Sequence, residues 1–190
     1  MLTIASWNIN SVRIRVDHLK KFIDDIKPDI IMLQEIKCSD EDFPDFYSDL
    51  NYKAIINGQK GKFGVAVLLK EHLTFKKIQI SSDILDKESR VNFIYINEID
   101  LNLINVYTPN GNPIENKEKF EFKIYWLEEL DKLSKNLIKQ NQNVLIAGDF
   151  NEFYEQGNDD VLLLNGVNLY LKQREPTCCG LTDITYENLA

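Results

Sequence analysis

Residues 29–35 read Asp-Ile-Ile-Met-Leu-Gln-Glu, an unbroken apolar run that two polar residues close at its carboxyl end. A short apolar run of this kind is typical of a strand that is buried on both faces of a sheet. Before it, apolar residues recur at helical spacing: Val16, Leu19, Phe22, Ile23 and Ile26. The spacing predicts an amphipathic helix of about four turns, with Asn10 or Ser11 as its N-cap and Pro28 as its end. The opening of the chain therefore predicts strand, helix and strand in that order.

Four apolar, strand-like runs end at polar residues that suit a metal ion or a phosphate. They lead into Trp7-Asn8, Gln34-Glu35, Tyr107-Thr108 and Gly148-Asp149. Because a buried strand delivers the residues that follow it to the rim of a sheet, we expect the four strand ends to meet in one cleft. The side chains that would line this cleft are Asn8, Glu35, Tyr107, Asp149 and Asn151.

Further helix and strand patterns extend the α/β organisation along the chain. The predicted strands lie at residues 64–69, 91–96, 99–106 and 144–147. The second and third of these form a hairpin around the pair Asn97-Glu98, although this pair is a weak turn signal. A long amphipathic helix is expected between residues 116 and 140. The chain contains no evident linker or repeat, so residues 1–190 predict a single α/β domain.

Composition narrows the classes of protein. The chain has 190 residues, of which 44% are hydrophobic, and a net charge of −8. An acidic chain of this kind does not bind nucleic acid over its whole surface, because nonspecific affinity for DNA comes mainly from lysine and arginine. A local basic rim around a metal site remains compatible with DNA.

The cysteines and the hydropathy pattern bear on where in the cell the protein is expected. The three cysteines are Cys38 and the adjacent pair Cys178-Cys179, an odd number that does not form a disulfide framework. The sequence shows neither a secretory leader nor an apolar run of about 18 residues. These observations predict a cytoplasmic protein without a membrane segment.

Two carboxylates at strand ends, Glu35 and Asp149, suit Mg²⁺, which prefers oxygen ligands and keeps several waters. Asn8 and Asn151 would orient these carboxylates or donate hydrogen bonds to a phosphoryl oxygen, and the Tyr107 hydroxyl would act in the same way. Taken singly, an acidic residue after a strand is more often a turn former or a helix cap. The joint pattern favours a site.

The same residues lie in motifs that resemble a known family. The motifs are Trp7-Asn8-Ile9-Asn10-Ser11-Val12-Arg13, Leu33-Gln34-Glu35-Ile36-Lys37, Gly58-Gln59-Lys60-Gly61, Arg90-Val91, Asn105-Val106-Tyr107-Thr108-Pro109-Asn110-Gly111, Lys119-Phe120 with Lys123, and Leu145-Ile146-Ala147-Gly148-Asp149-Phe150-Asn151. In order and spacing they resemble the exonuclease III branch of the endonuclease/exonuclease/phosphatase superfamily, the apurinic/apyrimidinic (AP) endonucleases. The resemblance covers residues 1 to about 152 and implies an incomplete four-layer α/β sandwich of the DNase I type.

The resemblance also implies an activity, which is Mg²⁺-dependent hydrolysis of the phosphodiester 5′ to an abasic site in double-stranded DNA, with Mn²⁺ as an alternative ion. The implied metal-site residues are Asn8, Glu35, Asp149 and Asn151. Tyr107 would contact the scissile phosphate, Asp149 would activate water or donate a proton, and Asn151 would be its partner. Lys60 and Arg90 would lie near the DNA, and a solvated charge is the alternative interpretation for both.

Beyond residue 152 the resemblance is thin. Members of the family carry an Asp-His signature near the C-terminus, but this chain has only His18 and His72, which we expect at the surface. Asp183 is a weak match and is better explained as a cap or turn residue. We therefore expect a truncated or divergent C-terminal part and impaired turnover. The alternatives are an inactive remnant that keeps part of the metal and DNA site, or a half-protein that a separate C-terminal fragment completes.

Overall fold

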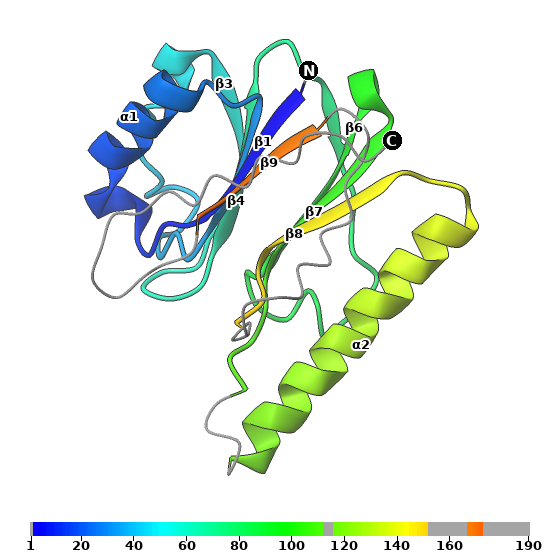
Figure 1. Ribbon diagram of the computed structural model, residues 1–190. Helices are drawn as coiled ribbons and strands as arrows, with labels where there is room; N and C mark the ends of the chain where they lie inside the picture. Colours follow the sequence, from blue (N-terminus) through cyan, green and yellow to red (C-terminus); the bar gives the residue numbers. More distant parts are fainter. Residues whose placement is uncertain (1, 112–115, 152–166, 173–190) are drawn as a thin grey trace.

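The computed structural model describes residues 2–111 and 116–151 together with the backbone of residues 167–172. Within these residues it contains two α-helices and nine strands (Figure 1). Their bounds are β1 Leu2–Asn8, α1 Val16–Ile26, β2 Ile30–Gln34, β3 Tyr52–Asn57, β4 Val65–Lys70, β5 Phe75–Lys77, β6 Val91–Ile96, β7 Leu101–Tyr107, α2 Lys117–Lys139, β8 Val144–Asp149 and β9 Val167–Lys172.

The strands form two sheets. The five-stranded sheet has the order β3-β4-β2-β1-β9, and the four-stranded sheet has the order β5-β6-β7-β8. Each sheet contains a parallel pair, β1 with β2 and β7 with β8, and the remaining described pairs are antiparallel except for β1 with β9. Because parallel strands run in one direction, the carboxyl ends of each pair lie side by side at one edge of their sheet.

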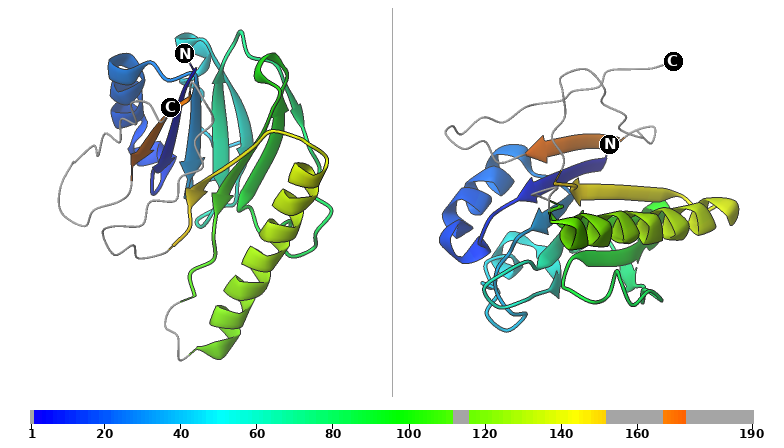
Figure 2. Two further views of the ribbon diagram at one scale, coloured as in Figure 1. Left: turned by 45° about the vertical axis from the view of Figure 1, so that its right-hand side comes forward. Right: turned by 90° about the horizontal axis from the view of Figure 1, so that it is seen from below.

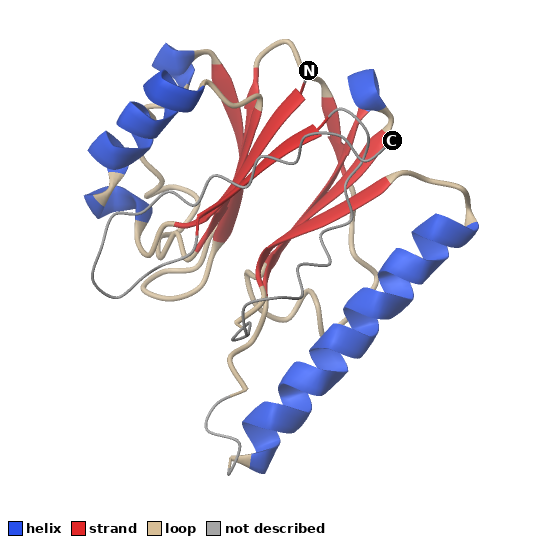
Figure 3. Cartoon of the chain, in the orientation of Figure 1, coloured by secondary structure: helices blue, strands red, loops and turns tan. Residues whose placement is uncertain are grey.

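The sheets face each other across an apolar core and each carries a helix on its outer face (Figures 2 and 3). The core between them includes Ile4, Met32, Val67, Leu103 and Leu145. A second apolar cluster joins α1 to the five-stranded sheet, and a third joins α2 to the four-stranded sheet through Trp126 and Leu130. The order helix, sheet, sheet, helix is the four-layer α/β sandwich that the sequence predicted.

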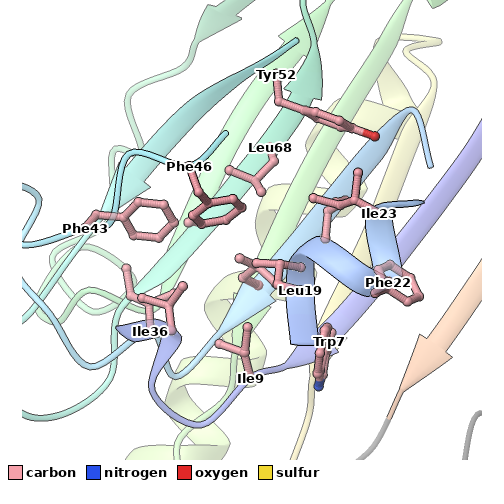
Figure 4. Packing of buried hydrophobic residues seen from close by; sticks show 14 of the residues in the cluster. Trp7, Ile9, Leu19, Phe22, Ile23, Ile36, Phe43, Phe46, Tyr52 and Leu68 are labelled. Atoms are coloured by element: carbon pink, nitrogen blue, oxygen red, sulfur yellow. The ribbon is translucent and has the colours of Figure 1, made fainter. Parts of the chain in front are cut away.

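Helix α1 forms as predicted but begins differently. Its apolar face packs Leu19, Phe22 and Ile23 against the sheet, and the Phe22 ring meets Trp7 edge to face at 5.7 Å (Figure 4). The predicted caps are wrong, since Arg15 occupies the N-cap position and makes no side-chain cap hydrogen bond. The helix has 11 residues, about three turns rather than four, because η1, a 3-10 helix over Val12–Ile14, takes up the chain before it.

The remaining predictions differ in detail. Asn116 caps α2 by accepting a hydrogen bond from the backbone N–H of Lys119 (3.2 Å). The β6–β7 hairpin is present, but its connection contains a 3-10 turn and ends at Asp100 in the left-handed conformation (φ 48°), so it is longer than two residues. Strands β3, β5 and β9 were not predicted.

A pair of buried amides connects the two sheets. Gln34 Nε2 of β2 donates to Asn105 Oδ1 of β7 (2.7 Å). Asn105 Nδ2 in turn donates to the carbonyls of Leu33 (3.1 Å) and Ala66 (3.0 Å) in the opposite sheet. Both side chains are fully buried, and a satisfied buried amide fixes one arrangement of its neighbours. This amide bridge holds β2 and β7 in a defined relative position.

Some sequence predictions concern side chains outside the predicted site. Cys38 is a buried free thiol, and burial raises its pKa to about 11. His18 and His72 are exposed, as expected, whereas Cys178, Cys179 and Asp183 lie outside the described residues. No helix within the described part of the chain is both long and apolar enough to cross a membrane.

Candidate active site at the carboxyl ends of the parallel strands

The two parallel pairs bring the predicted site residues to the same edge. Asn8 ends β1 opposite Gln34 of β2, and Glu35 follows directly. In the other sheet, Tyr107 ends β7 opposite Asp149, which ends β8. The strand register therefore places two polar side chains on each sheet at the same level.

Hydrogen bonds join these side chains across the sheets. Asn8 Nδ2 donates to Glu35 Oε1 (2.9 Å) and to Asp149 Oδ2 (2.6 Å). The Tyr107 hydroxyl also donates to Glu35 Oε1 (2.9 Å). The structure thus gathers the two carboxylates, one from each sheet, around a single amide nitrogen.

Asn151 orients the Asp149 carboxylate from the loop after β8. Its backbone N–H donates to Asp149 Oδ1 (2.8 Å), and its side-chain amide donates to the carbonyl of Thr108 (2.6 Å). Asn151 adopts the left-handed conformation (φ 51°), which asparagine tolerates better than most residues. Lys123 of α2 secures the loop by donating to the Asn151 carbonyl (3.0 Å).

Gly148 allows β8 to reach this position. Its φ is 148°, and a Cβ atom there would overlap the backbone carbonyl of Val106 on β7. A close backbone approach of this kind admits only glycine. Gly148 thus places Asp149 beside Tyr107.

Glu35 is held as a carboxylate. Burial alone would raise its pKa, but hydrogen bonds from Asn8, Lys37 and Tyr107 and the charge of Lys37 outweigh burial, so the pKa is lowered. The Lys37 ammonium lies 2.7 Å from Glu35 Oε2, on the side opposite the oxygen that Asn8 and Tyr107 contact. Glu35 is therefore ionised at neutral pH.

Tyr107 is held as a neutral phenol. Burial raises its pKa, and the negative charge and hydrogen bond of Glu35 raise it further, against smaller opposing effects of Asn151 and Arg90. A phenol that keeps its proton is a hydrogen-bond donor. Tyr107 can therefore donate to an anionic group brought to the site.

Of the two predicted DNA-facing residues, Lys60 is exposed whereas Arg90 is buried. The Arg90 guanidinium lies 3.8 Å from the Phe63 ring centroid and 5.1 Å from that of Tyr107. It also donates to Glu88 Oε2 (2.5 Å) and to the Tyr107 carbonyl (3.2 Å). The interpretation of Arg90 as a solvated charge is therefore wrong, because its side chain packs beneath the tyrosine.

The donor set fits a hard divalent cation in part. Glu35 and Asp149 supply carboxylate oxygens that face a common point, and Mg²⁺ needs only one or two carboxylates beside its waters. Asn8 turns its amide nitrogen toward them, because its Oδ1 accepts from the N–H of Asn10 (3.1 Å). Asn8 thus orients the carboxylates here, and ligation by its oxygen would require the amide to rotate. Among the described residues, no three His, Cys, Asp or Glu side chains gather as a metal cluster.

Sequence reasoning did not identify Lys37, Gln34 or Asn105 as site residues. Lys37 was noted only as part of a motif. Gln34 and Asn105 both carried a readable signal, because Asn105 stands among the apolar residues of β7 and Gln34 is the amide that ends the apolar run of β2. A polar residue at such a position needs a buried partner.

Two packed sheets with an outer helix on each and a polar cluster at one sheet edge form a fold of the DNase I-like class. Similar solved structures include an AP endonuclease from Archaeoglobus fulgidus (TM-score 0.70, 28% identity), with 82% of this chain and 60% of that chain covered. A Neisseria 3′ phosphatase, NExo, bound to a product DNA hairpin gives a TM-score of 0.68 at 26% identity, covering 78% of this chain and 57% of that one.

The sequence comparison agrees with the fold. Residues 5–185 match the model of the Endonuclease/Exonuclease/phosphatase family, and the chain belongs to this family. Exodeoxyribonuclease III of Haemophilus influenzae is 34% identical over 154 residues, which cover 79% of this chain and 57% of that protein. The Xenopus laevis DNA-(apurinic or apyrimidinic site) endonuclease 2 is 27% identical, covering 79% of this chain and 36% of that one. The chain thus spans little more than half the length of the Haemophilus relative and a smaller share of the Xenopus relative.

Proposed function

We propose that the chain is a Mg²⁺-dependent phosphodiester hydrolase of the exodeoxyribonuclease III and AP endonuclease type, acting on double-stranded DNA at abasic sites. The observation that carries the proposal is the pair of carboxylates, Glu35 and Asp149, that two different sheets bring to one amide nitrogen. The names of the relatives support DNA as the substrate class, since they include an exodeoxyribonuclease and endonucleases for apurinic or apyrimidinic sites.

Each side chain has a role that its contacts support. Glu35 and Asp149 would hold the ion, with Mn²⁺ as an alternative to Mg²⁺, and Asn8 and Asn151 would orient them. An ion bound there would polarise a phosphoryl oxygen and lower the pKa of a water molecule. Asp149 would accept the proton of the attacking water.

The substrate side of the site rests on three further residues. Tyr107 would turn its phenolic hydrogen from Glu35 to the scissile phosphate, since its raised pKa keeps it protonated. Exposed Lys60 would contact the DNA backbone as a point charge. Arg90 is buried and packs against the Tyr107 ring, which limits its direct contact with DNA. It would act on the substrate indirectly, through its contact with Tyr107.

A second candidate function is a chain that keeps the metal and DNA site but turns over slowly or not at all. It is favoured by the two histidines, His18 and His72, which are both exposed. His72 lies near Asp29, at the amino end of β2 rather than at the carboxyl end that carries Glu35. An acid or base group that is missing from an active site typically costs about 10²- to 10⁴-fold in rate. A separate C-terminal fragment that supplies such a group is the third possibility.

Cleavage of a duplex with one abasic site, measured on a gel with and without Mg²⁺, separates these candidates. We expect cleavage that requires Mg²⁺ and is lost in Glu35→Ala but kept in Asp29→Ala, which removes a comparable ion-paired carboxylate at the other end of β2. Absence of cleavage at high protein concentration would contradict the proposal that the chain alone is an active hydrolase. Cleavage restored by adding the C-terminal part of the Haemophilus relative would then identify a half-protein, and no restoration would identify an inactive remnant.

A further inference from the structure

Lys37 is the cation nearest the carboxylate that would bind the metal ion. Its Nζ lies 2.7 Å from Glu35 Oε2 and also donates to Asn10 Oδ1 (2.5 Å). The Glu35 side chain is only 15% exposed and that of Lys37 31% exposed, so water screens this pair less than a surface pair.

The backbone fixes this contact. Glu35 and Lys37 both adopt the left-handed conformation, with φ of 53° and 54°, which is uncommon for residues with side chains of this size. The backbone N–H groups of Ile36 and Lys37 donate to the carbonyls of Gly64 and Phe63, at 3.1 Å and 3.0 Å. The turn that carries Glu35 away from β2 therefore also returns the Lys37 ammonium to it.

Both carboxylate oxygens of Glu35 thereby have a partner in the structure. Asn8 and Tyr107 share Oε1, and Lys37 occupies Oε2. A divalent ion that binds Glu35 must either displace the ammonium or approach it closely. Displacement loses the attraction of the ion pair, and close approach brings two like charges together, so both carry a cost.

We propose that Lys37 acts as an intrinsic cation that sets the divalent-ion affinity of the site, by occupying the Glu35 carboxylate until an ion replaces it. Lys37 thus acts through Glu35 and is not itself a ligand of the ion. The inference rests on the proposed metal site and adds to it a competitor encoded in the chain. At a low concentration of divalent ions, Glu35 therefore stays paired with Lys37. The site binds a divalent ion only when that ion is abundant.

The alternative is that Lys37 merely holds Glu35 in place. The two roles predict opposite effects of removing the ammonium. Competition predicts tighter ion binding, because one positive charge has left the carboxylate. Orientation predicts weaker binding, because Glu35 becomes mobile.

Mn²⁺ binding to the full chain without DNA, followed by the electron paramagnetic resonance of free Mn²⁺, decides between them. We expect Lys37→Met and Lys37→Gln to bind Mn²⁺ about tenfold more tightly than the unmodified chain, as expected for loss of one neighbouring like charge. Lys70→Met is the matched control. Lys70 lies 2.9 Å from Asp29 with the same 31% exposure, so this variant removes an equivalent ion-paired charge away from the site.

Thermal melting of each variant confirms that it is folded before binding is measured. Suppose that the unmodified chain binds Mn²⁺ in a way that depends on Glu35. Unchanged or weaker binding in both folded Lys37 variants would then overturn the proposed competition and leave the proposed metal site standing. If neither the unmodified chain nor the Lys37 variants bind Mn²⁺, the proposed metal site fails and the competition fails with it. Equal tightening in Lys70→Met would attribute the effect to net charge and would also overturn the inference.

Discussion

Strand β2 carries an ion-paired carboxylate at each end, and the two pairs differ in what else they contact. At the amino end, Asp29 binds Lys70 (2.9 Å) and the backbone N–H of Thr3 (2.8 Å), so its partners belong to its own sheet. At the carboxyl end, Glu35 binds Lys37, but it also accepts from Tyr107 of the opposite sheet.

The comparison shows that an ion pair at a strand end is not in itself a sign of function. Both carboxyl groups have a lowered pKa and a lysine of equal exposure. Only the carboxyl end of β2 adds a second carboxylate, Asp149, and donors from both sheets. Contacts from both sheets distinguish the candidate site from the Asp29 ion pair, which only joins neighbouring strands of one sheet.

The largest expected effect comes from Gly148→Ala, which forces apart the strands β7 and β8 that bring Tyr107 and Asp149 to the carboxyl-end site. The new methyl group would overlap the Val106 carbonyl, so β8 must move away from β7 and carry Asp149 out of reach of Asn8. We expect a loss of about 3 kcal/mol in the free energy of unfolding, measured by urea denaturation.

Gly61→Ala is the control for this prediction. Gly61 has a similarly left-handed φ of 78° but no atom within 4 Å of the position of a Cβ, so the substitution there adds backbone strain without overlap. It should cost about 1 kcal/mol. Equal costs at the two glycines would show that the close approach of β7 and β8 is unimportant.

An intermediate effect is expected from divalent ions. Ligand that binds only the folded chain adds stability, about 1.4 kcal/mol at an ion concentration ten times Kd. We expect Mg²⁺ to raise the free energy of unfolding by this amount in the unmodified chain and in Asp29→Asn, but not in Glu35→Gln. An increment that survives Glu35→Gln would place the ion elsewhere.

The smallest expected effect is the pH dependence that arises at the amino end of β2. Burial opposes ionisation of Asp29, but hydrogen bonds from Thr3 and Lys70 outweigh it, so its pKa in the folded chain is lowered. The pair therefore adds stability above the unfolded pKa of about 3.9 and loses it as the pH falls through the folded pKa. A pair of this exposure contributes roughly 0.2–1 kcal/mol.

Urea midpoints between about pH 6 and pH 3, measured without divalent ions, test this contribution. Asp29→Asn should flatten the dependence on pH. Asp24→Asn, a change at an exposed carboxylate of α1, is the control for the loss of one charge. A flattening no greater than that of Asp24→Asn would contradict the prediction.

The sequence predicted the elements whose cause is local. Helices α1 and α2 follow from apolar periodicity, and the strands β1, β2, β7 and β8 follow from mainly apolar runs that end in polar residues. Strand β3 was missed because its burial does not alternate, and β5 because it has three residues. The predicted N-cap failed because Asn10 and Ser11 adopt positive φ in the preceding turn, which residue identity alone does not reveal.

The site was predictable in its members but not in its contacts. Parallel strands made it foreseeable that Asn8, Glu35, Tyr107 and Asp149 would meet. The place of Lys37 depends on two left-handed residues, and that of Arg90 on the rings of Phe63 and Tyr107. Both arise from tertiary structure that no spacing in the sequence encodes.

The amide bridge between Gln34 and Asn105 has a consequence for hydrogen exchange. Three hydrogen bonds between the two sheets would break if the sheets parted at this level. Opening them is therefore costly, and the backbone amides of β2 and β7 beneath the site should exchange with solvent only when the whole domain unfolds. The site residues above them thus stand on strands whose backbone amides exchange slowly, so their side chains can change position while the sheets beneath stay packed.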